Sequence, residues 1–570
     1  LLARRPFSDV ERLHQLADEI WAGMTESDWL EAFAAHPRIG GSKPPEVAKD
    51  TASWTSKEQS GMQSADESLK SKMAEKNAEY EQRFGFIYIV CASGKSAPEL
   101  LDMLTRRLYP DRDTELSTAA GEQLKITHLR LDKLINGTAR SGSFQYGTLD
   151  PLGQTAMVLL CPVQSWTPIG TTMQITKITT HVLKTPLGKE RFYSSQAAFP
   201  ERTSLLVRLE TDTGLVGWGE GGQYGPPEPV AACIHAVLGS QVLGSDPRNP
   251  AVLWERLYSM IRDFGQKGPY LEAISAIDIA CWDLLGQATG LPVHTLLGGA
   301  FRESVTAYAT GCYYRGEHAF GVSEDALQAL ADEARSYVED GFRILKIKLG
   351  LLSIEADVRR IEVIREAIGP NVTLLADANH AYNVSNALRV GRELERLDVR
   401  WFEEPIVPED LEGYRHLRQK LAIPIAGGEC EYTRYGFRNL FAQGCVDIAQ
   451  PDLCCAGGFS EFLKIQALAL AHHTPVIPHV WGSGIALATA LHALAATPWQ
   501  PYTYLPVALQ NEPVVEYDRN PNPLRDDILE QPFKLVEGKV AVPSGPGLGV
   551  TVIGPKLDKF TVTRQESKSS

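Results

Sequence analysis

The chain has 570 residues, 44% of them hydrophobic, and a formal net charge of −14 at pH 7. This length predicts several domains, because a single core seldom grows beyond roughly 250–300 residues. The acidic balance argues against a nucleic-acid partner, and no apolar run reaches the length that indicates a membrane-spanning helix.

The cysteines and the chain ends bear on the compartment. Nine cysteines are scattered along the sequence, and Cys454 and Cys455 are adjacent. Adjacent cysteines suit neither a disulfide nor a zinc cage, so reduced thiols and a cytoplasmic location are expected. The chain opens Leu-Leu-Ala-Arg-Arg-Pro rather than with Met, and no signal-peptide or peroxisomal pattern is present. We therefore expect a piece of the N-terminus to be missing.

The first part of the chain has helical periodicity. Apolar residues recur near every 3.6 positions in 10–33, 65–84, 97–107 and 116–135. Residues 138–172 are rich in Gly, Ser and Pro and show little periodicity, which is typical of a linker. The pattern predicts an all-α domain over 1–137, joined by the linker 138–172 to the rest.

After Met173 the pattern changes from helices to strands. Segments 175–184, 203–211 and 215–220 indicate an antiparallel meander, and helical stretches follow it. From 304 to 505 strands and helices alternate, and the remainder is strand-like. We predict a multidomain chain in which an α+β capping domain (173–303 and 506–570) wraps around a modified (β/α)7β TIM-type barrel (304–505).

Charged residues close successive apolar runs of the expected barrel. They are Lys346 with Lys348, Asp377, Glu403, Glu429, Asp452 and His479. Counted from Lys346, the gaps are 31, 26, 26, 23 and 27 residues, the length of a strand-plus-helix unit. In a parallel barrel these strand ends open on one face, so the charges should converge. Buried convergent charges are costly unless they bind a metal or do chemistry, and this pattern indicates an active site.

Three of these residues form a set of hard oxygen ligands. Asp377, Glu403 and Glu429 end successive strands, and such a set suits Mg²⁺, or Mn²⁺, better than zinc. The cation would bind a small-molecule carboxylate substrate and stabilise the enediolate formed when its α-proton leaves. One such carboxylate alone would more simply cap a helix or pair with a lysine. Glu404 should point to the opposite face of its strand and form a structural ion pair.

Two pairs are candidate bases. Lys346 and Lys348 share one face of their strand, and adjacent ammonium groups lower each other's pKa toward neutrality. His479 has Asp452 one unit earlier, and a carboxylate fixes the tautomer of an imidazole and raises its basicity. The alternatives are lysines on a solvated strand edge and a hydrogen-bonded core histidine. If both pairs are catalytic, they flank the α-carbon of the substrate.

With these motifs, residues 173–570 resemble the enolase superfamily, mandelate racemase subgroup, whose strands carry Lys-x-Lys, Asp, Glu, Glu, Asp and His in this order. The resemblance implies Mg²⁺ on Asp377, Glu403 and Glu429, the base Lys348 assisted by Lys346, and the dyad Asp452–His479 as the second base. It also implies loops near 188–199 and 222–227 that close over the substrate, and assembly into homo-oligomers. Asn379 is expected to contact the substrate.

Finer motifs, including Asp452-Leu-Cys-Cys-Ala-Gly-Gly and His479-Val-Trp-Gly-Ser-Gly, are similar to galactarolactone cycloisomerases and acid-sugar dehydratases. Mandelate racemase itself has an electrophilic glutamate after the eighth strand, where we expect Tyr504-Leu-Pro in this chain. This difference favours proton abstraction followed by elimination, as in a cycloisomerase or dehydratase. A racemase or epimerase is the alternative.

The N-terminal domain has its own motifs: His36-Pro-Arg-Ile-Gly-Gly, Glu58-Gln59, and Phe84-Gly-Phe-Ile. The pattern alone indicates a histidine at a helix end, a capping box and a buried turn. Residues 1–137 resemble OHCU decarboxylase, a cofactor-free helical enzyme that acts on 2-oxo-4-hydroxy-4-carboxy-5-ureidoimidazoline in purine catabolism. The resemblance implies the following site residues: His36 as acid/base, Glu58 and Gln59 on the substrate, and Phe84, Gly85, Phe86 and Ile87 closing the pocket. The alternatives are a silent binding or oligomerisation module, or two halves that are not made as one chain.

Overall fold

The computed structural model describes residues 10–34, 67–92, 95–138, 173–223, 225–316 and 319–569. The chain divides into two compact units, Leu1–Pro162 and Val163–Ser570. The expected linker, 138–172, lies outside the described residues apart from Thr138. None of the helices in the described ranges combines the length and apolar character needed to cross a bilayer.

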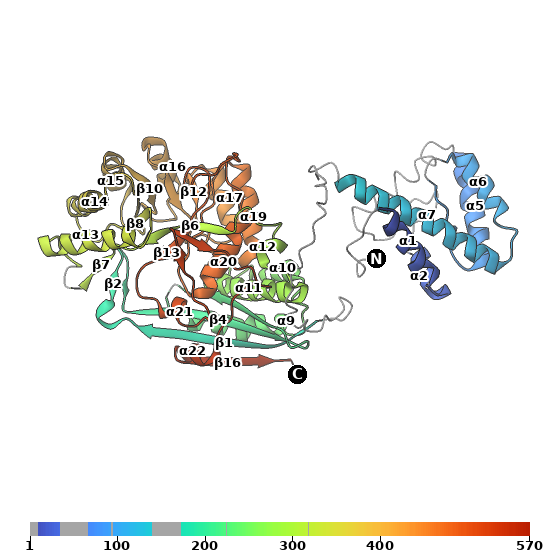
Figure 1. Cartoon of the computed structure of the whole chain (residues 1–570), viewed down its shortest axis with the longest axis horizontal. Helices are drawn as coiled ribbons and strands as arrows, with labels where there is room; N and C mark the ends of the chain where they lie inside the picture. Colours follow the sequence, from blue (N-terminus) through green and yellow to red (C-terminus); the bar gives the residue numbers. More distant parts are fainter. Residues whose placement is uncertain are drawn as a thin grey trace, which may run out of the picture. The chain divides into compact units, whose positions relative to one another are not determined.

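In the described part of the first unit the regular elements are helices, as predicted (Figure 1). They are α1 (Val10–Ala22), α2 (Glu26–Ala34), α5 (Glu67–Phe84), α6 (Ala97–Arg106) and α7 (Arg112–Thr138). The single helix expected over 10–33 is wrong: it breaks at Gly23, and Thr25 starts α2 by exchanging hydrogen bonds with Asp28. The core contains the rings of Phe33 and Tyr80 and a buried carboxylate, Glu115.

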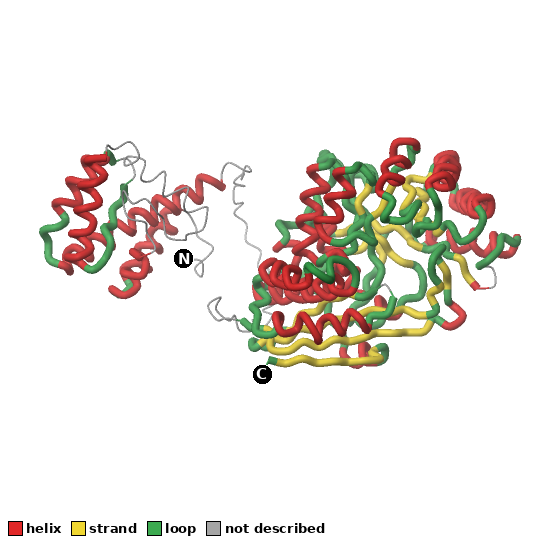
Figure 2. The backbone as a smooth tube through the Cα atoms, turned by 180° about the vertical axis from the view of Figure 1, so that it is seen from behind, coloured by secondary structure: helices red, strands yellow, loops and turns green. Residues whose placement is uncertain are grey.

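The capping domain is a four-stranded antiparallel sheet covered by helices (Figures 1 and 2). Its strands, in spatial order, are β16 (Thr561–Lys568), β1 (Ile175–Pro186), β4 (Glu201–Thr211) and β5 (Val216–Gly221). The main covering helices are α8 (Glu228–Cys233), α10 (Pro250–Ile261) and α11 (Pro269–Thr289). The meander predicted from 175, 203 and 215 is confirmed, and the C-terminal strand joins its edge.

Glycines on β5 explain how closely α11 packs on this sheet. A Cβ at Gly217, Gly219 or Gly221 would lie 1.9–2.4 Å from a backbone carbonyl oxygen of α11. Only glycine fits at such a close approach between backbones. The Gly-x-Gly-x-Gly pattern therefore fixes β5, and the loop that follows it, against the helix.

The other part of the second unit is the parallel barrel. Its strands include, in spatial order, β12 (Ile448–Ala449), β11 (Ile425–Gly427), β10 (Val399–Glu403), β9 (Thr373–Asp377), β8 (Ile344–Lys348) and β6 (Ser304–Thr310). The helices between and after them are α13 (Glu324–Glu339), α14 (Ile354–Ile368), α15 (Val384–Arg396), α16 (Leu411–Lys420), α17 (Thr433–Ala442), α19 (Gly458–Ala471) and α20 (Gly484–Ala495). Asp377 pairs with Lys348 on one side and Glu403 on the other, so the register sets all three at one level.

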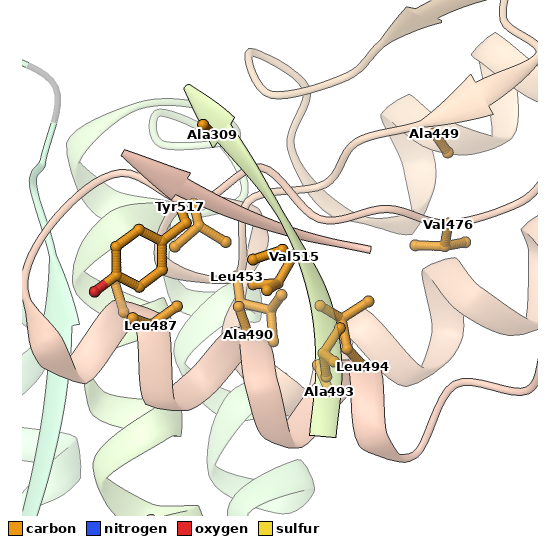
Figure 3. Packing of buried hydrophobic residues seen from close by; sticks show 14 of the residues in the cluster. Ala309, Ala449, Leu453, Val476, Leu487, Ala490, Ala493, Leu494, Val515 and Tyr517 are labelled. Atoms are coloured by element: carbon orange, nitrogen blue, oxygen red, sulfur yellow. The ribbon is translucent and has the colours of Figure 1, made fainter. Parts of the chain in front are cut away.

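The sequence predicted that the barrel ends at residue 505, but in the structure it continues beyond that residue. β13 (Val515–Asp518) pairs in parallel with β6 and so extends the barrel sheet, inside the range that we expected to belong to the cap. Figure 3 shows Leu487, Ala490 and Leu494 of α20 packed near Val515 and Tyr517 of β13. This strand is short, and a long Pro-containing connection separates it from α20, so the strand-helix rhythm does not reveal it.

Short elements connect the cap to the barrel or finish the chain. They include η2 (Gly188–Glu190), β2 (Phe192–Tyr193), β3 (Ala198–Phe199), β7 (Tyr314–Arg315), η3 (Ile234–Leu238), α9 (Gly239–Val242), α12 (Val293–Leu296), α18 (Leu453–Ala456), α21 (Pro523–Asp526), β14 (Leu535–Val536), β15 (Lys539–Ala541) and α22 (Gly554–Asp558). The small sheet β3-β2-β7 attaches the cap segment 192–199 to the loop after β6.

Candidate active site

The predicted acidic residues meet at the carboxyl ends of β9, β10 and β11. Oxygen atoms of Asp377, Glu403 and Glu429 all lie within 4.8 Å of one another, and the three side chains are buried. Burial raises the pKa of Glu403 to about 7 and that of Glu429 to about 8, with neighbouring carboxylates adding to the effect. Among the described residues, Glu429 Oε2 has no hydrogen-bond partner. Hard oxygens, crowded negative charge and an unsatisfied buried oxygen fit a divalent cation.

The two lysines of β8 lie against these carboxylates. Lys346 Nζ is 2.7 Å from Glu403 Oε1, while Lys348 Nζ contacts Asp377 and donates to Asn379 Oδ1 at 3.0 Å. Asn379 is therefore beside the base that we assigned from the sequence. Its backbone N–H also donates to Asp377 Oδ1 at 2.9 Å, which orients that carboxylate.

The carboxylates around the lysine pair, more than the neighbouring ammonium group, set the pKa of each lysine. That the pair provides a base near neutral pH stays a prediction. Burial acts to lower the pKa of both lysines, but attraction from carboxylates outweighs it. Glu403 and Glu516 hold the pKa of Lys346 well above its usual value, and Asp377 raises that of Lys348. For Lys348, the repulsion from Lys346 is a smaller effect than the attraction of Asp377.

On the other side of the acidic group lies the histidine–aspartate pair. His479 Nδ1 is 2.7 Å from Asp452 Oδ2, and His479 Nε2 is 3.6 Å from Glu429 Oε2. Burial opposes the charged imidazole, but Glu429, Glu516 and Asp452 together raise the pKa of His479 to about 10. Asp452 Oδ1 accepts the backbone N–H of Cys454 at 2.7 Å, so the start of α18 holds the carboxylate in place.

One acidic residue of this site was missed in the sequence. Glu516, on β13, lies 2.8 Å from Lys346 Nζ and accepts the hydroxyl of Thr310 at 2.5 Å. Burial opposes its ionisation, but Lys346 and His479 outweigh that and lower the pKa of Glu516 to about 2. The eighth strand therefore ends near a glutamate, and Tyr504, the residue expected there, is 96% exposed.

The signal for Glu516 was present but weak. It lies in Val514-Val515-Glu516-Tyr517, an apolar run that contains a charge like the other strand ends. Its distance from His479 is 37 residues, outside the range of 23 to 31 residues that defined the pattern.

A second missed residue comes from the capping domain. Gln223, buried after β5, donates its side-chain amide to Asp452 Oδ2, the oxygen that also binds His479. The loop is anchored by Glu220, whose carboxylate accepts the backbone N–H of Ser483 at 2.7 Å at the start of α20. Sequence spacing carries no signal for this contact, because Gln223 and Asp452 are 229 positions apart.

A cavity of about 620 Å³ joins these groups to the capping domain. From the barrel it is lined by Lys348, Asn379, His380, Glu429, Cys430, Tyr432, His479 and Trp481, among others. From the cap it is lined by Gln196, Phe199, Arg202 and Gln223, among others. The loops near 188–199 and 222–227, which were expected to cover the substrate, thus both contribute residues to the wall of this cavity.

The site expected in the first unit is only partly visible. His36, Glu58 and Gln59 lie outside the described residues. Phe84 and Phe86 are buried in the core of this unit, Gly85 is exposed with φ 81°, and Ile87 is half-buried. The two phenylalanine rings serve packing, so their role toward a ligand stays a prediction.

Three family models match the chain. Residues 177–298 match "Mandelate racemase / muconate lactonizing enzyme, N-terminal domain", residues 329–556 match "Enolase C-terminal domain-like", and residues 1–132 match "OHCU decarboxylase". The matches to the first two cover the capping domain and the barrel described above.

Among curated relatives, D-galactarolactone cycloisomerase of Agrobacterium fabrum is 43% identical over 391 residues, 68% of this chain and 99% of that protein. Arabinonate dehydratase of Saccharolobus solfataricus is 37% identical, over 61% of this chain and 88% of that protein. The crystal structure of the 3,6-anhydro-D-galactonate cycloisomerase from Zobellia galactanivorans has a TM-score of 0.60 and 39% identity, covering 68% of this chain and 100% of that one. Residues 1–132 are similar to the OHCU decarboxylase family, and the chain belongs to the mandelate racemase subgroup of the enolase superfamily.

Proposed function

We propose that the second unit removes the α-proton of a sugar-acid carboxylate in a Mg²⁺-dependent step and then eliminates a β-substituent. The observation that supports this best is the placement of two bases. Lys348 contacts Asp377, and His479 approaches Glu429 from the other side. The three carboxylates that would bind the cation therefore lie between the two bases. Both bases line one cavity.

Asp377, Glu403 and Glu429 would hold the cation, Mg²⁺ or Mn²⁺. When bound, it would stabilise the negative charge that develops on the substrate carboxylate as the α-proton leaves. The positive charge of the cation would also lower the pKa of Lys348, because Asp377 would then bind the cation as well as that lysine. Lys346 stays between Glu403 and Glu516 and holds both carboxylates in place.

In the elimination, one base takes the α-proton and the electron pair of the C–H bond forms the new carbon–carbon double bond. The bond from the β-carbon to its oxygen breaks, and that oxygen receives a proton from the other base. Asp452 stabilises the imidazolium form of His479 through its 2.7 Å hydrogen bond. In a lactone the leaving oxygen is the ring oxygen, and the product is an opened acid.

Two observations support a sugar acid as the substrate. The relatives are named for galactarolactone, arabinonate and galactonate. In this chain Arg202 lines the cavity from the cap, and its Nη1 has no hydrogen-bond partner within the part of the chain that the structure describes. A hydroxyl-rich or acidic distal end of the substrate would satisfy that donor.

A panel of aldarates, aldonates and their lactones, incubated with the protein and Mg²⁺ in D₂O, tests the proposal. We expect a 2-keto-3-deoxy acid or an opened lactone, abolished by Lys348→Ala and by His479→Asn. Lys420→Ala, on the exposed end of α16, should behave like the wild type. Recovered substrate with an inverted, deuterated α-carbon would support racemisation or epimerisation instead. No turnover and no α-deuterium with any member of the panel would contradict the proposal.

For the first unit we propose decarboxylation of OHCU toward allantoin, with His36 as the acid/base. The support is the match of residues 1–132 to that family and the compact helical core of the described part. The full chain should release CO₂ from OHCU, and His36→Ala should not. Equal rates in the two proteins would favour a silent binding or oligomerisation module. Homo-oligomer formation, which we expect from the family, is tested by analytical ultracentrifugation.

A further inference from the structure

A second group of ligand-type side chains lies beside the acidic triad Asp377/Glu403/Glu429. His380, Glu404 and Cys430 each follow a triad residue by one to three positions, at the ends of β9, β10 and β11. Their ligand atoms lie within 4.8 Å of one another. His380 Nε2 is 2.7 Å from Glu404 Oε2 and 3.7 Å from Cys430 Sγ.

The backbone departs from regular strand geometry at two of these residues. Glu404 has φ 41° and His380 has φ 65°, although neither is a glycine. Each such conformation costs roughly 1 kcal/mol or more and is concentrated at functional sites. Glu404 was expected to point to the opposite face, because strand side chains alternate. The ion pair expected for it is present, but its partner is His380 in the cavity wall.

The imidazole of His380 is oriented from the cap. Gln196 of the cap places its side-chain nitrogen 2.6 Å from His380 Nδ1. This contact occupies one ring nitrogen and leaves Nε2 facing Glu404 and Cys430. The Gln196 nitrogen donates to Nδ1 in this arrangement, so Nε2 carries the proton that faces Glu404. Binding a metal through Nε2 requires the other tautomer, with the Gln196 amide turned so that its oxygen accepts the Nδ1–H.

The local charge leaves room for a second cation. Six buried carboxylates surround this end of the barrel: Asp377, Glu403, Glu404, Glu429, Asp452 and Glu516. The buried lysines that pair with them, Lys346 and Lys348, supply two positive charges. A protonated His479 supplies a third, so the excess is three negative charges, and one divalent cation on the triad would leave one of them uncompensated.

We propose that His380, Glu404 and Cys430 form a second cation site, separate from the acidic triad, that takes Zn²⁺ or another borderline-soft divalent transition metal. One nitrogen, one oxygen and one sulfur ligand match zinc and cobalt and are unsuited to Mg²⁺. Three protein ligands leave an open coordination position. His380 and Cys430 line the substrate cavity, so that position is accessible to a molecule bound there.

Co²⁺ is the probe, because a thiolate ligand gives it a charge-transfer absorption in the near ultraviolet. The full-length protein, saturated with Mg²⁺, is titrated with Co²⁺. We expect one further equivalent per chain, with the thiolate band and the intense visible bands of tetrahedral cobalt. Cys430→Ser should abolish the thiolate band, and His380→Asn should weaken binding at least tenfold.

Cys233→Ser is the matched control, since Cys233 is also partly exposed and lies on α8 of the cap. It should leave the spectrum unchanged. Near-ultraviolet circular dichroism shows whether each variant keeps its fold. A thiolate band that persists in Cys430→Ser would overturn the proposal. So would Co²⁺ binding that is lost when Mg²⁺ is added, because Co²⁺ would then occupy only the site that Mg²⁺ takes. The readout does not use turnover, so it is independent of the function proposed for the triad.

Discussion

Replacing Gln223 with methionine tests whether the capping domain helps to organise the proposed catalytic dyad. The amide of Gln223 donates to Asp452 Oδ2, and the same oxygen binds His479 Nδ1 at 2.7 Å. Methionine has a similar length and fills the same buried space without a donor. Asp452 would keep the backbone N–H of Cys454 on its other oxygen, so the dyad should be loosened and not lost.

The expected size of the effect follows from the hydrogen bond. A hydrogen bond to a charged group contributes about 1.5–3 kcal/mol. With about 1.36 kcal/mol for each factor of ten, loss of this contact should lower kcat roughly 10- to 100-fold. KM should change little, because the donor holds Asp452 and the reacting proton is handled by His479.

The assay is steady-state kinetics, with α-deuterium exchange, on the substrate that the panel identifies. Gln287→Met is the matched control, because its amide donates to the backbone carbonyl of Val216 at 2.7 Å, within the cap. A kcat within twofold of wild type would refute the reasoning. A change confined to KM would instead show that Gln223 binds the substrate.

Three further predictions concern the cation site and stability. Glu429→Gln should weaken Mg²⁺ binding in calorimetry by tenfold or more, since it removes a charged ligand; unchanged affinity would remove Glu429 from the site. Burial lowers the pKa of His492 to about 4, so the unfolded state binds more protons between about pH 6.5 and 4 and stability falls as the pH drops through this window. Between pH 6.5 and 5 the loss should be about 2 kcal/mol in urea unfolding, and His492→Gln should abolish it. Arg107→Met leaves the buried Glu115 without its cation and should destabilise the first unit by about 3–5 kcal/mol, seen as an earlier thermal transition that leaves the second unit's transition in place.

The position of Glu516 changes one argument about the reaction. The apparent absence of a glutamate after the eighth strand had favoured elimination over racemisation. The structure has a buried glutamate on that strand, paired with Lys346. That sequence argument therefore no longer separates the two outcomes, and the D₂O experiment must distinguish them.

Much of this site is encoded locally. Each charge from Lys346 to His479 follows a short apolar run, and the length of one strand-helix unit brings such residues to the same end of a parallel barrel. The close approach of the three triad carboxylates and the hydrogen bond between Asp452 and His479 agree with that spacing.

Other features depend on contacts between distant segments. Gln223 reaches Asp452 only because α11 packs tightly on β5 and Glu220 ties the following loop to α20. Glu516 joins the site because β13 pairs with β6, after a connection that interrupts the regular spacing. The direction of the pKa shift at Lys346 and Lys348 also required the structure, since it depends on how many carboxylates lie near each ammonium group. Spacing along the chain determines which residues end at the same level of a barrel, whereas packing in three dimensions determines which groups from elsewhere come within hydrogen-bonding distance of them.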